Sequence, residues 1–361
     1  MSQPIHGPHA HSNQRMPLMM LQVLLALTPA TLYGFWLYGW PAFNLWLICL
    51  LSALGWEALF LKFFSKNVPR HLLDGSALVT GWLLALCLPP WAPWWLAVVG
   101  TFLAVAMIKQ IFGGLGQNVF NPAMAARVML LIAFPVEMTQ WIAPEAVQLD
   151  RPDFVAGLGQ TFGSLSLLDA YTGATLLDEV KNQQSLGAAL PDILQAQQYN
   201  MAATLLGQHA GSTGESTALL LLLGGLFLLF RGVITWQAPV GLLLGLGVPA
   251  LLMNLWQPES YPGLAFHLFT GGAMLAAWFI VTDPVTGPTT ATGRLVFGLG
   301  CGLLAWLVRT WGSYPEGIAF AVMLMNSATP VLDRYFKPRI YGRTSSGAPL
   351  PATGKTSGDA S

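Results

Sequence analysis

Residues 18–38, LMMLQVLLALTPATLYGFWLY, carry no charged side chain. An α-helix of about 20 residues crosses the hydrocarbon core of a bilayer, so this stretch is long enough to span one. Further apolar runs follow along the chain, at residues 42–61, 76–88, 93–111, 119–135, 217–231, 236–255, 264–282, 294–311 and 316–332. The sequence therefore predicts an all-α polytopic membrane protein with about ten transmembrane helices. The third and sixth runs are short, which predicts tilted or discontinuous helices there.

The composition excludes several classes of protein. Hydrophobic residues make up 54% of the chain and charged residues only 9%, whereas a soluble domain is about one quarter charged. The formal net charge is zero, so nothing in the bulk charge favours nucleic acid as a partner. Cys49, Cys87 and Cys301 lie far apart in apolar runs. That spacing argues against a metal site or an iron–sulfur cluster held by this chain alone.

The placement of Lys and Arg indicates the orientation in the membrane. If the N-terminus is cytoplasmic and the spans alternate, twelve of the 16 basic residues fall on the inner face and three on the outer face. Cytoplasmic loops are typically the basic ones, so we expect both termini inside and residues 136–215 outside. Trp91, Trp94 and Trp95 fall at one external turn and are expected to form an aromatic belt.

Two segments of the chain resemble each other. Residues 71–78, HLLDGSAL, match residues 267–274, HLFTGGAM, and Trp82 matches Trp278 at the same offset. Each match lies at the start of the third span of its half. Because five spans per half is an odd number, the halves would have opposite orientations, as in the inverted repeats of many transport proteins. Matches of small residues in apolar helices also arise by coincidence, so both interpretations stay open.

The expected organisation has five parts. A cytoplasmic arm, residues 1–17, precedes a first five-helix repeat, residues 18–135. One larger external loop, residues 136–215, leads to a second five-helix repeat, residues 216–333, and to a cytoplasmic, partly disordered tail, residues 334–361.

The external loop contains the sequence DAYTGAT at residues 169–175. Small residues around a threonine leave its hydroxyl accessible, and Asp169 is placed to help a modifying enzyme bind metal or activate that hydroxyl. Taken alone, the segment is also consistent with an ordinary loop that leads towards the next span.

Two polar interruptions lie at predicted membrane boundaries, KQIFGGLGQNVFNPA at residues 109–123 and TDPVTGPT at residues 282–289. Gly113 and Gly114 are expected to break the helix and to permit close approach of a backbone or a ring. Asn118 and Asn121 add polar groups, and all four residues are therefore candidate cofactor contacts.

Ionisable residues within spans are costly and are functional candidates by default. Arg127 lies deepest and is consistent with a contact to a cofactor phosphate or with a buried ion pair. Asp283 precedes a proline, where it would cap a helix or ligate a cation. Glu57 lies near the cytoplasmic edge, where snorkelling to the interface competes with a role in an ion path.

Taken together, the chain resembles the D subunits of Rnf electron-transport complexes and, more distantly, the B subunits of the sodium-pumping NADH:quinone reductase. The resemblance runs from about residue 18 to residue 342. It is carried by motifs in a family-like order: DGSA at residues 74–77, FNPA at 120–123, DAYTGAT at 169–175, TDPVT at 282–286 and PRIYG at 338–342.

The resemblance implies cofactors. The loop segment is similar to the D-x-x-[ST]-G-A-[ST] signature at which flavin transferases attach FMN through a phosphoester, here to Thr175. Asp169, Thr172, Gly173 and Ala174 would complete that motif. The resemblance also leaves room for a second flavin, riboflavin, bound non-covalently among the helices.

The resemblance further implies a place and a role. The chain would lie in the inner membrane of a bacterium, with residues 136–215 in the periplasm and with the A, B, C, E and G subunits of the Rnf complex as partners. It would relay electrons in a ferredoxin:NAD type oxidoreductase coupled to Na⁺ or H⁺ movement, with Asp283 and Glu57 as candidates for the ion path. The alternative is a small-solute channel or transporter of inverted-repeat fold without a redox role.

Overall fold

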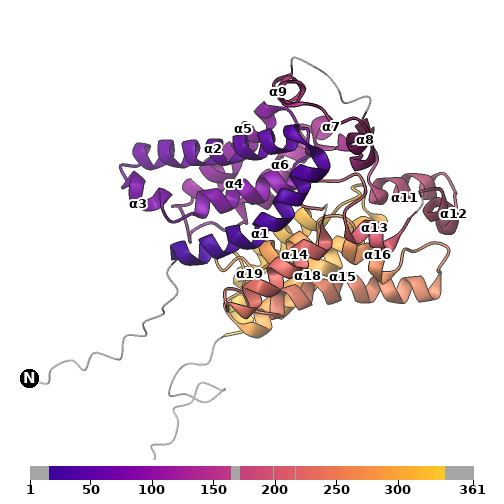
Figure 1. Ribbon diagram of the computed structural model, residues 1–361. Coiled ribbons are helices and arrows are strands. Elements are labelled where there is room, and N and C mark those ends of the chain that lie inside the picture. Colours follow the sequence, from indigo (N-terminus) through magenta and orange to yellow (C-terminus); the bar gives the residue numbers. More distant parts are fainter. Residues whose placement is uncertain (1–15, 164–170, 198, 216, 338–361) are drawn as a thin grey trace, which may run out of the picture.

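The computed structural model describes residues 16–163, 171–197, 199–215 and 217–337, and it is mostly helical (Figure 1). The first half contains α1 (Met16–Tyr38), α2 (Trp40–Phe63), α3 (Val68–Leu72), α4 (Ser76–Cys87), α5 (Trp94–Thr101), the π-helix η1 (Phe102–Gln110) and α6 (Pro122–Ala133). The second half contains α14 (Ala218–Phe230), α15 (Gln237–Trp256), α16 (Leu264–Phe269), α17 (Ala273–Leu275), the π-helix η2 (Ala276–Ile280), α18 (Ala291–Trp311) and α19 (Ile318–Tyr335).

The helices fit a multi-pass membrane protein. By length and composition, α1, α2, α15 and α18 can each cross a bilayer. Shorter apolar helices lie at Ser76–Cys87, Trp94–Gln110, Pro122–Ala133 and Ala218–Phe230. Two of these, α4 and α14, are the runs that the sequence marks as short, and with 12 and 13 residues they fall below the length of a full span.

The predicted span at residues 264–282 is not one helix, and that expectation is wrong. The chain breaks between α16 and α17, where Gly271 adopts a left-handed conformation with φ of 65°. The matching glycine of the first half, Gly75, is also left-handed, with φ of 77°, and separates α3 from α4. Only glycine adopts this conformation readily, so the two similar segments share a helix break.

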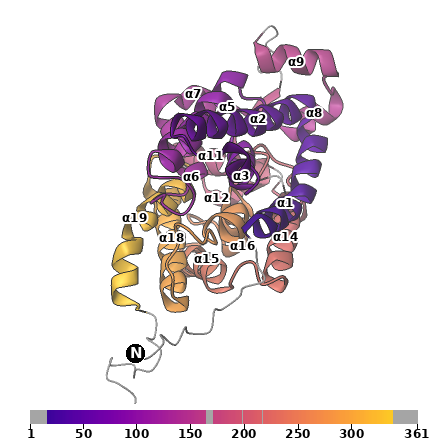
Figure 2. The same ribbon diagram turned by 90° about the vertical axis from the view of Figure 1, so that its left-hand side faces the viewer.

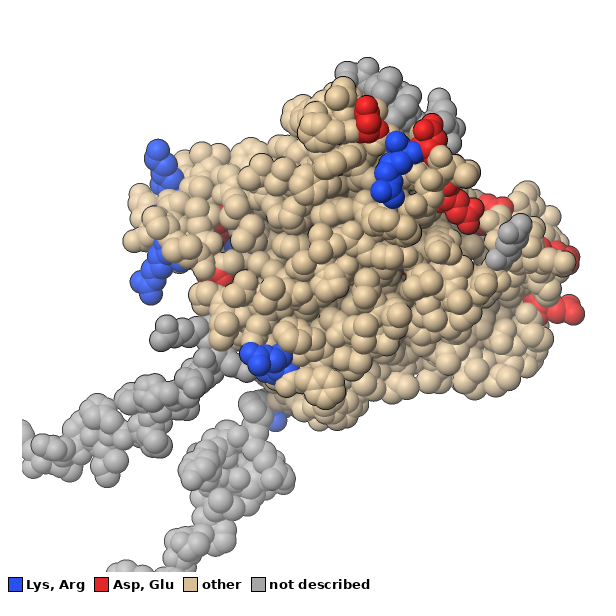
Figure 3. Space-filling view, in the orientation of Figure 1, with Lys and Arg blue, Asp and Glu red and all other residues tan. Residues whose placement is uncertain are grey.

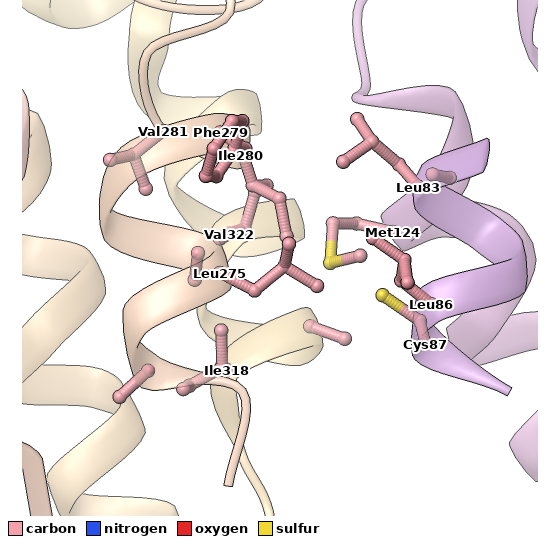
Figure 4. Packing of buried hydrophobic residues seen from close by; sticks show 14 of the residues in the cluster. Leu83, Leu86, Cys87, Met124, Leu275, Phe279, Ile280, Val281, Ile318 and Val322 are labelled. Atoms are coloured by element: carbon pink, nitrogen blue, oxygen red, sulfur yellow. The ribbon is translucent and has the colours of Figure 1, made fainter. Parts of the chain in front are cut away.

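The two halves pack against each other along a continuous apolar core. Figure 2 shows α2 and α5 on one side of the molecule and α15 on the other. Between them, Cys87 and Met124 of the first half face Leu275 and Val322 of the second (Figure 4). All three cysteines are free and buried.

Helices α15 and α18 approach so closely that only glycine fits between them. A Cβ placed on Gly245 would lie 2.2 Å from the Leu299 carbonyl oxygen, and one on Gly302 would lie 2.2 Å from the Leu242 carbonyl oxygen. Small residues allow such close packing of membrane helices.

We expect Gly302→Val to destabilise the protein by about 3 kcal/mol, because the added side chain meets backbone that cannot move aside. The measurement is thermal unfolding of the detergent-purified variant. Gly55→Ala is the control, since nothing lies within 4 Å of a Cβ at that position. Equal midpoints for the two variants would show that the helices are not in contact there.

A small unit formed by the described residues between 134 and 215 lies at one end of the bundle (Figure 1). Its described helices and strands are α7 (Pro135–Met138), β1 (Trp141–Ile142), α8 (Pro144–Leu149), α9 (Phe154–Phe162), β2 (Thr172–Gly173), α11 (Leu176–Ser185), α12 (Leu190–Ala196) and α13 (Met201–Leu205). The two strands are antiparallel, with Trp141 opposite Gly173 and Ile142 opposite Thr172.

The aromatic-belt expectation is wrong for Trp91. Its side chain is buried, its Nε1 donates a hydrogen bond to the Tyr38 carbonyl oxygen at 2.8 Å, and its ring centroid lies 4.9 Å from that of Tyr171. Trp94 is exposed as expected. Trp91 therefore anchors the 134–215 unit to the membrane helices.

Candidate functional site

Thr175 is the N-cap residue of α11. Its Oγ1 accepts a hydrogen bond from the Asp178 backbone N–H at 3.1 Å and donates one to Asp178 Oδ2 at 2.8 Å. Thr175 is 8% exposed, whereas Thr172 and Ala174 beside it are exposed. The hydroxyl thus lies just beneath the surface, behind two accessible residues.

The segment before Thr175 is held in place by backbone and side-chain contacts. Thr172 and Gly173 form β2, which pairs with β1. The Tyr171 carbonyl oxygen accepts a hydrogen bond from the Ala143 backbone N–H at 2.9 Å, and the Tyr171 hydroxyl donates one to the Asp150 carbonyl oxygen at 2.8 Å. The segment is therefore anchored even though it lies outside the membrane helices.

The helix that Thr175 caps is docked on the second half. Lys181 Nζ donates hydrogen bonds to the Tyr314 carbonyl oxygen at 2.9 Å and to the Val308 carbonyl oxygen at 3.3 Å. A cation is favourable there, because the C-terminal carbonyls of α18 carry partial negative charge. Burial lowers the pKa of Lys181, although Asp178 nearby opposes that shift.

A buried cluster of charged side chains lies next to α11. Arg127 Nη2 is 2.6 Å from Glu316 Oε2 and 3.9 Å from Glu215 Oε1, and Arg309 Nη2 is 3.7 Å from Glu316 Oε1. A Cβ on Gly271 would lie 2.6 Å from Arg309 Nη2 and 2.9 Å from both Glu316 Oε1 and Leu177 Cδ1. Leu177 therefore packs where the cluster meets the helix break. Of the two roles considered for Arg127, the contacts show the buried ion pair; a flavin contact stays a prediction.

A cavity of about 100 Å³ lies between the halves, at the end of the molecule where α1 begins. Apolar side chains from α1, α4, α14 and η2 form most of its wall. Its polar lining residues are Ser76, Thr80, Lys109, Asn118, Asn121, Thr282 and Asp283. The structure thus brings Asn118, Asn121 and Asp283 together, from two interruptions about 160 residues apart in the sequence.

Glu57 does not snorkel to the interface, and that expectation is wrong. Its Oε1 lies 3.0 Å from Lys109 Nζ, and both side chains are 2% exposed. Lys109 Nζ also donates a hydrogen bond to Ser76 Oγ at 2.7 Å. Lys109 is one of the twelve basic residues assigned to the inner face, and its side chain is buried there and not exposed. The two residues neutralise each other in the interior, because either charge alone would be costly to bury.

Asp283 closes a turn after η2. Its Oδ1 accepts a hydrogen bond from the Val285 backbone N–H at 3.0 Å and its Oδ2 accepts one from Thr286 Oγ1 at 3.0 Å. Asn121 Nδ2 lies 3.5 Å from the same Oδ2, while Asn121 Oδ1 caps α6 by accepting from the Met124 backbone N–H. Asp283 therefore holds a turn and caps no described helix, since the C-cap residue of η2 is Val281 and the N-cap residue of α18 is Thr290. The expected capping role is wrong, and the side chain instead faces the other half of the chain.

The remaining candidates fall in different places. Gly113 and Gly114 have φ of 121° and 103°, which confirms that they break the helix, but Leu115 rather than either glycine lines the cavity. Asp169 lies outside the described residues.

Sequence reasoning missed partners that only the fold brings together. Glu316 and Lys109 each complete a buried ion pair, yet each lies far along the chain from its partner. Asp178 was missed as well, although the pattern Thr-x-x-Asp before a helix is a recognised capping signal.

This fold and site define a multi-pass membrane protein. It carries the Thr175 motif on the 134–215 unit and a cavity at the opposite end, where α1 begins. The chain belongs to the NQR2, RnfD, RnfE family, whose model matches residues 4–342.

Three relatives are each named as the D subunit of an ion-translocating oxidoreductase complex. The one from Halorhodospira halophila is 50% identical over 355 residues, which cover 97% of this chain and 98% of the relative. The one from Stutzerimonas stutzeri is 49% identical over 335 residues, covering 92% and 94%. The one from Escherichia coli is 42% identical over 347 residues, covering 93% and 97%.

Proposed function

We propose that this chain is the membrane-embedded, electron-transferring flavoprotein subunit of an ion-translocating oxidoreductase complex of the ferredoxin:NAD type. The observation that carries the proposal is the Thr175 motif, anchored on the end unit of a chain whose relatives are subunits of such a complex. The A, B, C, E and G subunits of that complex are its proposed partners, and a flavin transferase is the proposed maturation enzyme.

The residues around Thr175 fit a covalently attached FMN. Its hydroxyl lies at the start of α11, where backbone N–H groups favour a phosphate. Thr172 and Ala174 leave an approach from solvent. Asp178 and Glu179 in the first turn oppose a second negative charge, so the covalent bond, rather than electrostatic attraction, would retain the cofactor. When bound, FMN would accept and donate electrons one or two at a time.

The inner cavity fits part of a second flavin. Apolar walls with a few polar groups are typical of cofactor sites, which usually measure about 300–1,000 Å³. This cavity is smaller, at about 100 Å³, so riboflavin would have to displace Met16, Met19 or Met20 at its edge. Methionine side chains adapt readily. Asn118, Asn121 and Asp283 would then be its polar contacts.

The distribution of charge supports the proposed orientation. In Figure 3, Lys and Arg lie mainly at the end that carries α3 and the start of α1, whereas Asp and Glu lie mainly at the end that carries α8, α11 and α12, where a basic side chain near α8 is also visible. The positive end is expected in the cytoplasm. We accordingly place both termini inside a bacterial inner membrane, residues 136–215 in the periplasm, and Thr175 across the membrane from the cavity.

The proposed architecture has ten membrane segments in two inverted repeats. The shared left-handed glycines, Gly75 and Gly271, support it. In this arrangement α16, α17 and η2 together form the eighth segment, and the short α4 and α14 cross with the help of their flanking residues.

Fusions to a topology reporter test this orientation. We expect a reporter after Lys181 to be exposed to the periplasm and one after Lys337 to face the cytoplasm. Alkaline phosphatase and a fluorescent protein provide the two complementary readouts. A cytoplasmic signal from the Lys181 fusion would overturn the proposed topology.

Flavin fluorescence separates this function from a channel or transporter, which needs no flavin acceptor. Co-expressed with a flavin transferase, the wild-type chain should fluoresce as a denatured gel band under ultraviolet light. Thr175→Ala should be dark, and Thr175→Ser should retain some signal because it keeps a hydroxyl. A dark wild-type band with an active transferase would favour the channel.

A further inference from the structure

The contact between Thr175 and Asp178 goes beyond a helix cap. A capping box uses two bonds to backbone N–H groups. The first of them is present here, because Thr175 Oγ1 accepts from the Asp178 backbone N–H at 3.1 Å. The 2.8 Å bond from the Thr175 hydroxyl to Asp178 Oδ2 is additional to that motif.

This additional bond has the geometry of an activated nucleophile. A hydroxyl becomes a nucleophile when a neighbouring base lies about 2.6–3.2 Å away and is itself oriented by a third group. Asp178 Oδ2 meets the distance, and the first turn of α11 holds the two residues together, because the Asp178 backbone N–H also donates to Thr175 Oγ1. Among the described contacts, Oγ1 uses its hydrogen and one lone pair on Asp178, which leaves a second lone pair for attack.

We infer that Asp178 is the base that takes the proton from Thr175 when this hydroxyl is joined to the flavin phosphate. The inference rests on the proposed attachment of FMN to Thr175. It adds Asp178, which lies outside the seven-residue motif, to the residues that act in the modification.

The step balances with a flavin dinucleotide as donor, because a hydroxyl forms a phosphoester only with an activated phosphate. Oγ1 of Thr175 attacks the phosphorus on the flavin side of the pyrophosphate, and an Oγ1–P bond forms. The P–O bond to the second phosphate breaks, and AMP leaves with the electron pair. The proton passes from Oγ1 to Asp178 Oδ2, and nothing is oxidised or reduced.

The surroundings of Asp178 suit a base. Burial raises the pKa of its carboxyl above the usual range, which strengthens it as a proton acceptor. Lys181 on the same helix lowers that pKa, and Glu316 from the α18–α19 connection raises it. The ionised carboxylate is the active form, so attachment should speed up as pH rises through this elevated pKa and then level off.

Attachment kinetics test the inference. The full-length chain, made without flavin transferase, is purified and mixed with excess transferase and FAD, and FMN on the Thr175 peptide is followed by mass spectrometry. We expect Asp178→Asn to attach FMN at least tenfold more slowly and to lose the pH inflection. Asp178→Glu should recover part of the rate. Asn keeps the backbone N–H of the cap and an oxygen that can accept from the Thr175 hydroxyl, so a change of pH profile marks the loss of the base.

Glu179→Gln is the matched control. It removes the same charge from the same turn, but its Oε1 accepts from Gln183 Nε2 and does not contact Thr175. Equal slowing in the Asp178→Asn and Glu179→Gln chains would assign the effect to charge and overturn the inference, as would a wild-type rate and pH profile for Asp178→Asn. Absence of FMN from wild-type Thr175 would instead sink the proposed function, so the two failures are distinguishable.

Discussion

Thr175→Ala should stop electron transfer by the whole complex and ion pumping together. In the proposed orientation the tethered FMN lies on the side opposite the cytoplasmic nicotinamide and ferredoxin, so electrons have to pass it to complete their path. The alanine variant should still fold, because among the described residues the hydroxyl bonds only to Asp178, and loss of an N-cap costs about 1 kcal/mol.

The measurement uses purified complexes in liposomes, assayed for ferredoxin:NAD electron transfer and for ion uptake. Both rates should fall at least a hundredfold, since no other residue of the motif supplies the proposed attachment point. Thr175→Ser is the control for folding and should retain part of both activities. Turnover of the alanine complex at the wild-type rate would show that this flavin is not on the electron path.

Asp283→Asn should impair ion pumping at least as much as electron flow. The side chain lies in the wall of the inner cavity and contacts Asn121 of the first half. Asparagine can still accept from the Val285 backbone N–H through its Oδ1, which preserves the turn. Its side chain carries no charge, however, and an NH₂ group takes the place of the Oδ2 that accepts from Thr286 Oγ1. We therefore expect about a tenfold loss of ions moved per unit time, with a smaller or equal loss of electron flow.

Asp333→Asn provides the comparison for Asp283→Asn. Asp333 Oδ1 accepts from the Thr289 backbone N–H at 2.9 Å in an exposed position outside the cavity. It bonds to Thr289 in the loop before α18 and is not among the residues that line the cavity. The Asp333 variant should pump normally. Fully coupled, normal turnover in the Asp283→Asn complex would remove Asp283 from the ion path.

Local features of the sequence predicted local features of the structure. Apolar runs marked α1, α2, α15 and α18 to within a few residues. Glycine pairs marked a helix break at Gly113 and Gly114, because the conformational freedom of glycine is a property of a single residue. The break inside residues 264–282 was missed, although Gly271 and Gly272 form a glycine pair there as well, because the apolar residues on both sides of the pair read as one continuous span.

Long-range partners were beyond the reach of the sequence. Arg127 and Glu316 are 189 residues apart and Lys109 and Glu57 are 52 apart, and nothing in either local pattern identifies the other member of the pair. The cost of burying one charge predicts that a partner exists but not which residue it is. Asp178 is different, because it lies three residues from Thr175 and its capping signal was readable.

Site-resolved mass spectrometry of the wild-type chain tests the central claim most directly. The chain is isolated from the active complex and digested, and the peptide that contains Thr175 is fragmented. The account predicts an FMN-sized mass increment on Thr175, held through a phosphoester and absent from every other residue. An unmodified Thr175 in a fully active complex, or the same increment on another residue, would contradict it.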